Sequence, residues 1–241
     1  MILIAGPCVI ESAEHALKMA HILTEMTASC PVDFYFKASW NKANRSSGGS
    51  YRGVHIRRAV QIFERIKDEC GCLITTDVHE CWQIEPLNGV IDMFQIPALL
   101  SRQTSLIVDA ANTGKPVNIK KGQFMSPTVA HMAAAKARSV GCEEILITER
   151  GSSFGYEDLV VDFRSFWKLK DSITTPVKVL FDATHSCCGE HEVVNPMAQA
   201  AVAFGVDGLF IECHDDPAIA LCDGASMITP DELEDLLGDV C

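Results

Sequence analysis

The feature that most limits how this chain can fold is a regular alternation of short apolar runs and amphipathic segments. Eight runs rich in apolar or β-branched residues predict strands at Ile2–Ala5, Asp33–Phe36, Leu73–Thr76, Ile91–Ile96, Pro116–Ile119, Glu144–Thr148, Val177–Phe181 and Gly208–Ile211. Between most of them, apolar residues recur at helical spacing, which predicts helices such as Ala13–Thr27, Val54–Cys70, Thr104–Asn112, Pro127–Ser139 and Asn195–Phe204. Elements that alternate in this way indicate an α/β fold with a parallel sheet covered by helices.

The length and the positions of polar residues favour a closed barrel over an open sheet. Eight units in 241 residues correspond to roughly 30 residues each, the size of a βα repeat. Polar residues follow the predicted strands at Cys8, Lys37, Asp77, Gln95, Lys120, Glu149, Arg150, Asp182, His185 and Glu212. A barrel brings all strand ends to one mouth, whereas a doubly wound sheet spreads them along an edge. We therefore predict a single (β/α)8 TIM barrel over residues 1–241.

Composition excludes several classes of protein. The chain is 48% hydrophobic, and 20 Lys and Arg against 32 Asp and Glu give a net charge of −12, which argues against sequence-independent nucleic-acid binding. No apolar run approaches the roughly 20 residues that span a bilayer, and the first residues, MILIAGPC, do not resemble an export signal. Eleven cysteines leave at least one thiol unpaired. We expect a cytoplasmic protein with reduced thiols and no membrane partner.

Three clusters of basic residues and glycines follow three different predicted strands. The segment Lys37–Arg58 carries six basic residues and no acidic one, which fits either an anion site or a solvated basic loop. Lys120 lies within Asn118–Gly122, and Arg150 lies within Thr148–Gly155, each beside glycine. The three clusters together favour phosphate binding. Neither a Walker motif nor a dinucleotide-binding motif occurs, so we predict no nucleotide cofactor.

Four residues after predicted strands could bind a divalent metal ion. Cys8, His185, Glu212 and Asp223 offer one thiolate, one imidazole and two carboxylates. They form no local metal motif, so the residues alone favour a buried thiol with ordinary polar residues at a barrel mouth over a metal site. Cys187, Cys188 and Cys222 lie near this candidate set, unlike the other cysteines, which we expect to be core or incidental thiols.

A series of motifs resembles a known enzyme family. In order and in register from residue 2 to about 235, the motifs are Gly6–Ser12, Lys42–Ser47, Thr76–Glu80, Gln95–Ala98, Arg102–Thr104, Asn118–Phe124, Glu149–Gly151, Phe154–Tyr156, Leu159–Asp162, Asp182–His185 and Gly208–His214. They resemble those of 3-deoxy-D-manno-octulosonate 8-phosphate synthases. The sister family, 3-deoxy-D-arabino-heptulosonate 7-phosphate synthases, shares the barrel, but the Lys42–Ser47 stretch is of the octulosonate type.

The resemblance implies a reaction and a set of substrate-binding residues. The family condenses phosphoenolpyruvate with D-arabinose 5-phosphate and releases phosphate, a step toward lipopolysaccharide sugar, in barrels that usually form homotetramers. Positions that bind phosphoenolpyruvate in the family correspond here to Lys37, Ser39, Lys42, Gln95, Lys120 and Arg150. Positions that bind the aldose phosphate correspond to Asn44, Arg45 and Ser46. Arg102 matches an arginine that reaches into the neighbouring subunit's site.

The resemblance also implies a metal and catalytic groups. Members with cysteine in the first motif are metal-dependent, so Cys8 indicates this type, with His185, Glu212 and Asp223 as the other ligands. Such a site accepts iron, manganese, zinc or cadmium. We expect Lys42, Asp77 and His185 to form the catalytic group, because Asp77 and His185 could handle protons near the reacting carbon.

Two departures from the family pattern concern the aldehyde substrate. The stretch between His185 and Glu212 is shorter than usual and carries no Lys or Arg, and Leu99 stands where an aromatic residue is usual. A related synthase that uses another phosphorylated aldose, such as erythrose 4-phosphate, is therefore one alternative. A catalytically silent homologue that binds metal or phosphate is another. Against it stand Lys120, Arg150 and the complete set of metal ligands, which a silent copy need not keep.

Overall fold

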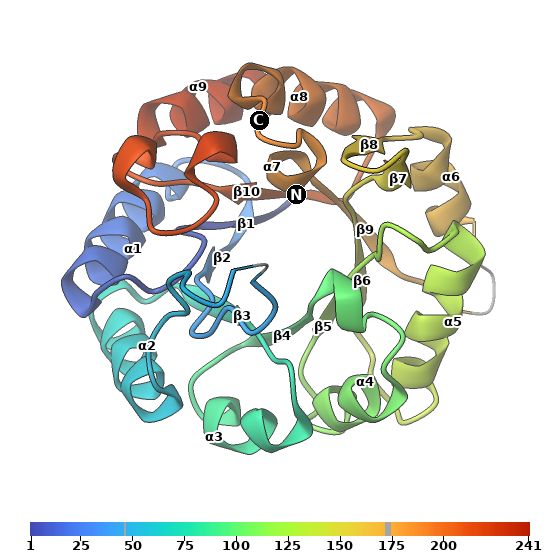
Figure 1. Ribbon diagram of the computed structural model, residues 1–241, viewed down its shortest axis with the longest axis horizontal. Helices are drawn as coiled ribbons and strands as arrows, with labels where there is room; N and C mark the ends of the chain where they lie inside the picture. Colours follow the sequence, from blue (N-terminus) through green and yellow to red (C-terminus); the bar gives the residue numbers. More distant parts are fainter. Residues whose placement is uncertain (46, 172–174) are drawn as a thin grey trace.

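The computed structural model describes residues 1–45, 47–171 and 175–241 and contains a closed barrel. Eight parallel strands form it in the order β1, β10, β9, β6, β5, β4, β3, β2, as Figure 1 shows along the barrel axis. Their bounds are β1 (Ile2–Gly6), β2 (Asp33–Lys37), β3 (Leu73–Asp77), β4 (Met93–Ile96), β5 (Val117–Lys120), β6 (Ile145–Glu149), β9 (Lys178–Asp182) and β10 (Gly208–Glu212). Each corresponds to a predicted strand. The predicted (β/α)8 TIM barrel is confirmed.

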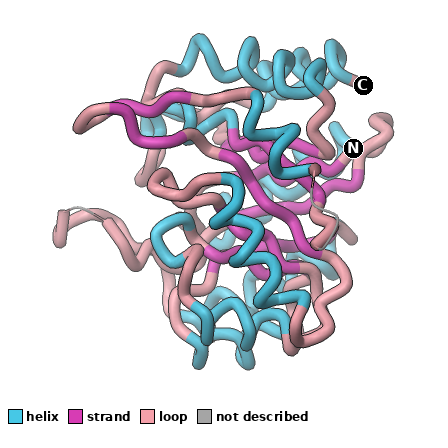
Figure 2. Tube along the Cα trace, turned by 90° about the vertical axis from the view of Figure 1, so that its right-hand side faces the viewer, coloured by secondary structure: helices cyan, strands magenta, loops and turns pink. Residues whose placement is uncertain are grey.

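Helices surround the strands on the outside, as the side view in Figure 2 shows. The α-helices are α1 (Ala13–Thr27), α2 (Ile56–Cys70), α3 (Ile84–Asn88), α4 (Thr104–Ala111), α5 (Pro127–Arg138), α6 (Arg164–Lys170), α7 (Ala183–Ser186), α8 (Val194–Phe204) and α9 (Pro230–Val240). Short 3-10 helices are η1 (Cys81–Gln83), η2 (Ala98–Leu100), η3 (His191–Val193), η4 (Pro217–Ile219) and η5 (Gly224–Ser226). Among the helices of the described ranges, none has the length and apolar character needed to cross a membrane.

Side-chain alternation along the strands divides the barrel interior into an apolar and a polar part. The apolar part is a cluster of buried residues: Ile2, Ile4, Tyr35, Met93, Leu146, Leu180 and Phe210. Side chains two positions apart on a strand point to the same face. The inward positions two residues beyond these apolar ones are therefore polar, and they include Lys37, Gln95, Thr148, Asp182 and Glu212. The same period that fills the barrel thus places functional groups at its mouth.

A short antiparallel hairpin follows β6 and was not predicted. It pairs β7 (Ser152–Phe154) with β8 (Asp158–Val160) and is largely exposed. The bend before it is fixed by buried Glu149, whose Oε1 accepts hydrogen bonds from the amides of Arg150 and Gly151 at 3.0 and 2.8 Å. Lys121 Nζ lies 3.1 Å from the same oxygen. These contacts fix the direction in which the chain runs from the end of β6 into Arg150.

Close packing of β1 against β2 depends on Gly6. Its φ of +154° is rare for other residues, and a Cβ there would lie 2.2 Å from the carbonyl oxygen of Lys37. The absence of a side chain lets the end of β1 approach the end of β2. Cys8, which follows β1, and Lys37, the last residue of β2, are brought together in this way, and Lys37 Nζ donates to the Cys8 carbonyl at 2.9 Å.

Candidate active site

The carboxyl ends of the strands open into a cavity of about 500 Å³. The segment between β2 and α2, drawn in blue in Figure 1, extends over this end of the barrel. The cavity is lined by Lys37, Lys42, Asn44, Arg45, Ser47, Ser50, Asp77, His79, Gln95, Pro97, Ala98, Leu99, Lys120, Gln123, Arg150, His185, Phe210 and Asp223. Most of the residues predicted for the site are therefore brought together.

The remaining predicted residues have different locations. Ser39, Glu212 and Cys8 are buried. They contact Asp77, Lys37 and Asp223, respectively, which line the cavity. Arg102 is exposed and does not line the cavity; its carbonyl oxygen accepts from Lys136 Nζ at 2.9 Å. Ser46 lies outside the described residues.

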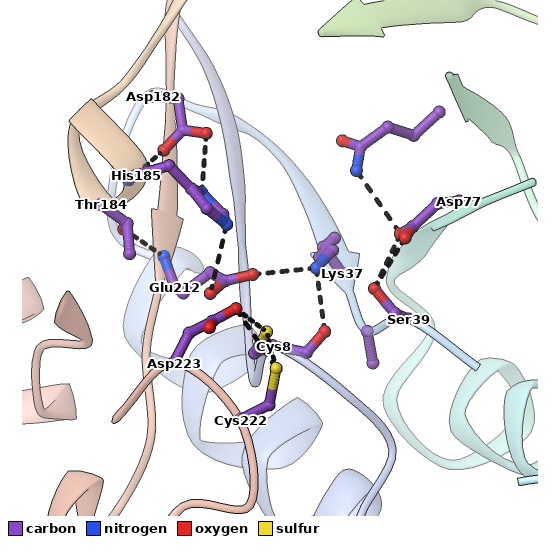
Figure 3. A network of polar contacts seen from close by, with 12 residues as sticks. Cys8, Lys37, Ser39, Asp77, Asp182, Thr184, His185, Glu212, Cys222 and Asp223 are labelled. Carbon is purple, nitrogen blue, oxygen red and sulfur yellow. Dashed lines mark hydrogen bonds and ion pairs between the residues drawn. The ribbon is translucent and has the colours of Figure 1, made fainter. Parts of the chain in front are cut away.

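The four predicted metal ligands form a continuous network at one side of the mouth (Figure 3). Cys8 Sγ lies 3.1 Å from Asp223 Oδ2, and His185 Nε2 lies 3.8 Å from Glu212 Oε2. Their donor atoms fall into two groups, each within 4.8 Å, and Asp223 belongs to both. One group is completed by His185 and Glu212, the other by Cys8 and Cys222.

Cys222 is a member of this network that was not assigned a role from the sequence. Its Sγ lies 3.1 Å from Cys8 Sγ and 3.2 Å from Asp223 Oδ2. Arg45 Nη1 lies 2.8 Å from Cys222 Sγ and 3.0 Å from Asp223 Oδ1. The only signal for Cys222 was its position directly before Asp223.

The donor set fits a divalent cation of intermediate softness. Glu212 is fully buried, and although burial raises its pKa, Lys37 and His185 hold the pKa below the usual value, so the carboxylate is ionised. Lys37 Nζ occupies Oε1 at 3.0 Å, whereas Oε2 is buried and has no hydrogen-bond partner. Burial raises the pKa of the Cys8 thiol well above its usual value. A cation would pair with the free oxygen and favour the thiolate.

Asp182 orients His185 and holds Lys120. This fully buried carboxylate lies 2.8 Å from His185 Nδ1 and accepts from the His185 amide at 2.9 Å. With Nδ1 directed to Asp182, Nε2 is left facing Glu212, an arrangement typical of metal-binding histidines. The other charged partner of Asp182 is Lys120. Burial raises the pKa of Asp182, but His185 and Lys120 outweigh it and hold the pKa far below the usual range.

Asp77 is held as a carboxylate on the opposite side of the cavity. Ser39 Oγ donates to both carboxylate oxygens, at 2.8 and 2.9 Å, and Gln95 Nε2 lies 3.5 Å away. Burial raises the pKa of Asp77, but Lys37 and Lys42 outweigh it and hold the pKa at about 2. Asp77 is therefore an acceptor at neutral pH.

A relay of buried side chains fixes the orientation of Gln95. Thr148 Oγ1 donates to Asn118 Oδ1 at 2.7 Å, and Asn118 Nδ2 donates to Gln95 Oε1 at 3.1 Å. The Gln95 amide nitrogen is thereby directed toward Asp77. Sequence reasoning included Asn118 and Thr148 in motifs but gave neither a role.

Comparisons with known proteins agree with this geometry. The DAHP synthetase I family matches the chain over residues 1–239. This chain belongs to that family. It is 45% identical to a 2-dehydro-3-deoxyphosphooctonate aldolase of Desulfatibacillum aliphaticivorans, over 98% of this chain and 89% of the relative. It is 46% identical to the protein of the same name from Magnetococcus marinus, over 98% of this chain and 85% of the relative. Within the DAHP synthetase I family, the chain thus resembles proteins named for an octonate.

Proposed function

We propose that this protein joins phosphoenolpyruvate to D-arabinose 5-phosphate, giving 3-deoxy-D-manno-octulosonate 8-phosphate and phosphate. It is a phosphoenolpyruvate-dependent aldol-type synthase. The name of these relatives specifies a phosphorylated octonate, an eight-carbon acid. Three of these carbons come from phosphoenolpyruvate, so the second substrate supplies five. The sister reaction, with a four-carbon aldose, gives a seven-carbon acid and does not fit that name.

The observation that carries this proposal is a cavity lined by five basic side chains, one of which has a buried nitrogen without a hydrogen-bond partner. Lys37, Lys42, Arg45, Lys120 and Arg150 all face it. Arg150 Nη1 is buried yet has no hydrogen-bond partner. Two phosphorylated substrates repel one another in a site of low dielectric, and several fixed cations are needed to neutralise them. The arrangement suits the binding of two anions side by side.

The proposed reaction places charges that the site can stabilise. The C3 carbon of the enol forms a bond to the aldehyde carbon, and positive charge develops at C2. Asp77, held ionised by Lys37 and Lys42, is positioned to stabilise that charge. The aldehyde oxygen becomes a hydroxyl on gaining a proton. Lys42, whose pKa is raised by Cys8 and Glu212 in spite of burial, stays charged and can donate a hydrogen bond to that oxygen.

The later steps need a water molecule and a proton acceptor. Water adds to C2 and loses one proton, which balances the proton gained by the aldehyde oxygen. The hydroxyl formed at C2 then gives up its proton to the departing phosphate as C2 becomes a carbonyl group. Asp77 and His185 are our candidates for handling the proton that water loses. Asp77 is the acceptor when His185 Nε2 binds the metal ion, because a metal-bound nitrogen has no lone pair left for a proton. Lys120 and Arg150 would retain the phosphate group during these steps.

We propose that Cys8, His185, Glu212 and Asp223 hold a divalent metal ion, with iron, manganese, zinc and cadmium as candidates. Such an ion supplies polarisation of the aldehyde or orientation of a water molecule. The free Oε2 of buried Glu212 supports the assignment.

Product analysis tests the proposed function. Phosphate release from phosphoenolpyruvate is measured with arabinose 5-phosphate and with erythrose 4-phosphate, before and after chelator treatment and with added Mn²⁺. Turnover that depends on arabinose 5-phosphate and is restored by the metal supports both parts of the proposal. Turnover with erythrose 4-phosphate alone would favour the alternative suggested by Leu99, an exposed residue that lines the cavity. Absence of phosphate release with both aldoses would favour the catalytically silent homologue that binds metal or phosphate.

The pH dependence of catalysis should report Lys120. Burial lowers the pKa of Lys120 to about 8, although Asp182 opposes the shift. Above that pH the free enzyme loses a positive charge, so kcat/KM for phosphoenolpyruvate is expected to fall as pH rises through about 8. The Lys120→Arg variant keeps its charge, so its profile should be flat there even if its rate is lower. An equally steep fall in that variant would contradict the assignment.

We propose that the protein acts as a homotetramer in which Arg102 completes a neighbouring subunit's site. Its exposed position outside the cavity is compatible with this role. Arg102→Ala is expected to raise KM for the aldose phosphate by about tenfold, because a charge-assisted bond to phosphate is lost, with KM for phosphoenolpyruvate unchanged. Steady-state kinetics check this, with exposed Arg57→Ala as the control. An unchanged aldose KM would contradict the shared site.

A further inference from the structure

We propose that Glu11, His15 and His214 form a second divalent-cation site, distinct from the group around Cys8 and Asp223, for zinc or an ion of similar softness. One donor atom from each residue lies within 4.8 Å of the other two. Glu11 and His15 belong to the start of α1 and the loop before it, and His214 follows β10. None of the three lines the active-site cavity.

Two buried ring nitrogens in this cluster have no hydrogen bond. They are His15 Nδ1 and His214 Nε2. The His214 side chain is 1% exposed, so water does not readily reach it. Its Nε2 lies 3.4 Å from Glu11 Oε1, close enough for charge attraction but without a hydrogen bond. A buried polar atom without a partner destabilises the fold, and a cation bound by the two nitrogens and the carboxylate would remove that cost.

One carboxylate oxygen lies near both of the opposite ring nitrogens, and it is hydrogen-bonded to that of His15. Asp215 Oδ1 lies 2.8 Å from His15 Nε2 and 3.2 Å from His214 Nδ1. Lys18 Nζ holds the other oxygen of Asp215 at 2.6 Å. A carboxylate that accepts from the outer nitrogen of a histidine leaves the inner nitrogen with a lone pair for a metal. Here one carboxylate can do so for two histidines, which makes the cluster a built site.

His214 has a partner for Nδ1 with or without the cation. The Asp216 amide lies 2.9 Å from Nδ1 and donates to it when the proton is on Nε2, facing Glu11. When a cation occupies Nε2, the proton moves to Nδ1 and is donated to Asp215. In that state the Asp216 amide no longer has Nδ1 as its acceptor.

The cation would link the start of α1 to the segment that carries Cys222 and Asp223. Glu11 Oε1 accepts from the Leu221 amide at 2.8 Å, two residues before Asp223. An ion that fixes Glu11 therefore also fixes the start of the segment that carries Cys222 and Asp223. Its ligands, two imidazoles and one carboxylate, match zinc sites with three protein ligands.

Zinc content of variants tests the proposal. After dialysis against Zn²⁺ and removal of free metal, wild-type protein should hold two ions per chain and Cys8→Ala should hold one. The double variants Cys8→Ala/Glu11→Gln and Cys8→Ala/His15→Leu should hold none. Glu11→Gln keeps an acceptor for the Leu221 amide, so the local fold is expected to survive. Zinc-free Cys8→Ala, or a double variant that still holds one ion, would overturn the proposal.

A matched control and a spectrum identify the ligands. His21 lies on the same helix and is 45% exposed, so Cys8→Ala/His21→Leu should keep its ion. With Co²⁺ as the probe, Cys8→Ala should give visible bands without thiolate-to-cobalt charge transfer, since the proposed ligands contain no sulfur. Charge transfer that disappears in Cys8→Ala/Cys222→Ser would place the ion beside Cys222 and refute the second site. No arm depends on catalytic activity, so failure of the proposed reaction would leave this result unaffected.

Discussion

Replacing Cys8 with alanine is expected to abolish metal retention at the active site and to lower phosphate release by roughly a hundredfold or more. Cys8 contributes the thiol that contacts both Cys222 and Asp223. Without this thiol, Cys222 and Asp223 lose their contact with the segment that follows β1. Metal content by elemental analysis and phosphate release with arabinose 5-phosphate measure the two effects. Restoration of turnover by millimolar Mn²⁺ alone would mean that Cys8 contributes affinity rather than a required ligand.

Cys142→Ala is the matched control for this substitution. Cys142 is as buried as Cys8, but its sulfur contacts the backbone carbonyl oxygens of Lys115 and Glu144 and none of the proposed metal ligands that the structure describes. Its removal leaves a small cavity, so it should lower stability without changing metal content or turnover. A fully active, metal-free Cys8→Ala protein would refute the metal assignment.

The fold and much of the site could be predicted from the sequence because both follow from the same two-residue period. Strands such as β10 read as apolar runs, and the polar residue that ends the run points to the same interior face as Phe210 two positions earlier. Lys120 and Glu212 could therefore be placed at the mouth before their partners were known. The barrel brings the remaining site residues together, because the carboxyl ends of its strands lie on one rim.

Contacts made by loops and by relays could not be predicted in this way. Cys222 reaches Cys8 through an irregular segment whose path has no periodic signal. Asn118 and Thr148 read as ordinary strand residues until the register of β5 and β6 is known. The cluster of Glu11, His15 and His214 depends on the adjacency of β1 and β10, which only closure of the barrel supplies. The role of Arg102 depends on a second subunit and stays a prediction.

Asp182→Asn is expected to lower the free energy of unfolding by about 3 kcal/mol at neutral pH. Removal of the carboxylate charge leaves the buried Lys120 ammonium without its counter-ion. The carboxylate is fully buried between Lys120 and His185. Its pKa in the folded protein is far below the usual range, so its stabilisation is present above the unfolded-state pKa of about 3.9 and is lost as pH falls below that value. Urea unfolding at pH 7 and near pH 3 measures the difference, which should shrink at the lower pH.

Asp207→Asn separates this effect from the general loss of a carboxylate. Asp207 also pairs with a lysine, Lys170, at 2.7 Å and also accepts a backbone amide, but about a third of each side chain is exposed. Solvent screens that pair, so its loss should cost no more than about 1 kcal/mol. Because Asp182 also orients His185, Asp182→Asn should weaken metal binding at the active site, whereas Asp207→Asn should not. Equal destabilisation by the two substitutions would contradict the central role that the structure gives to Asp182 in the barrel mouth.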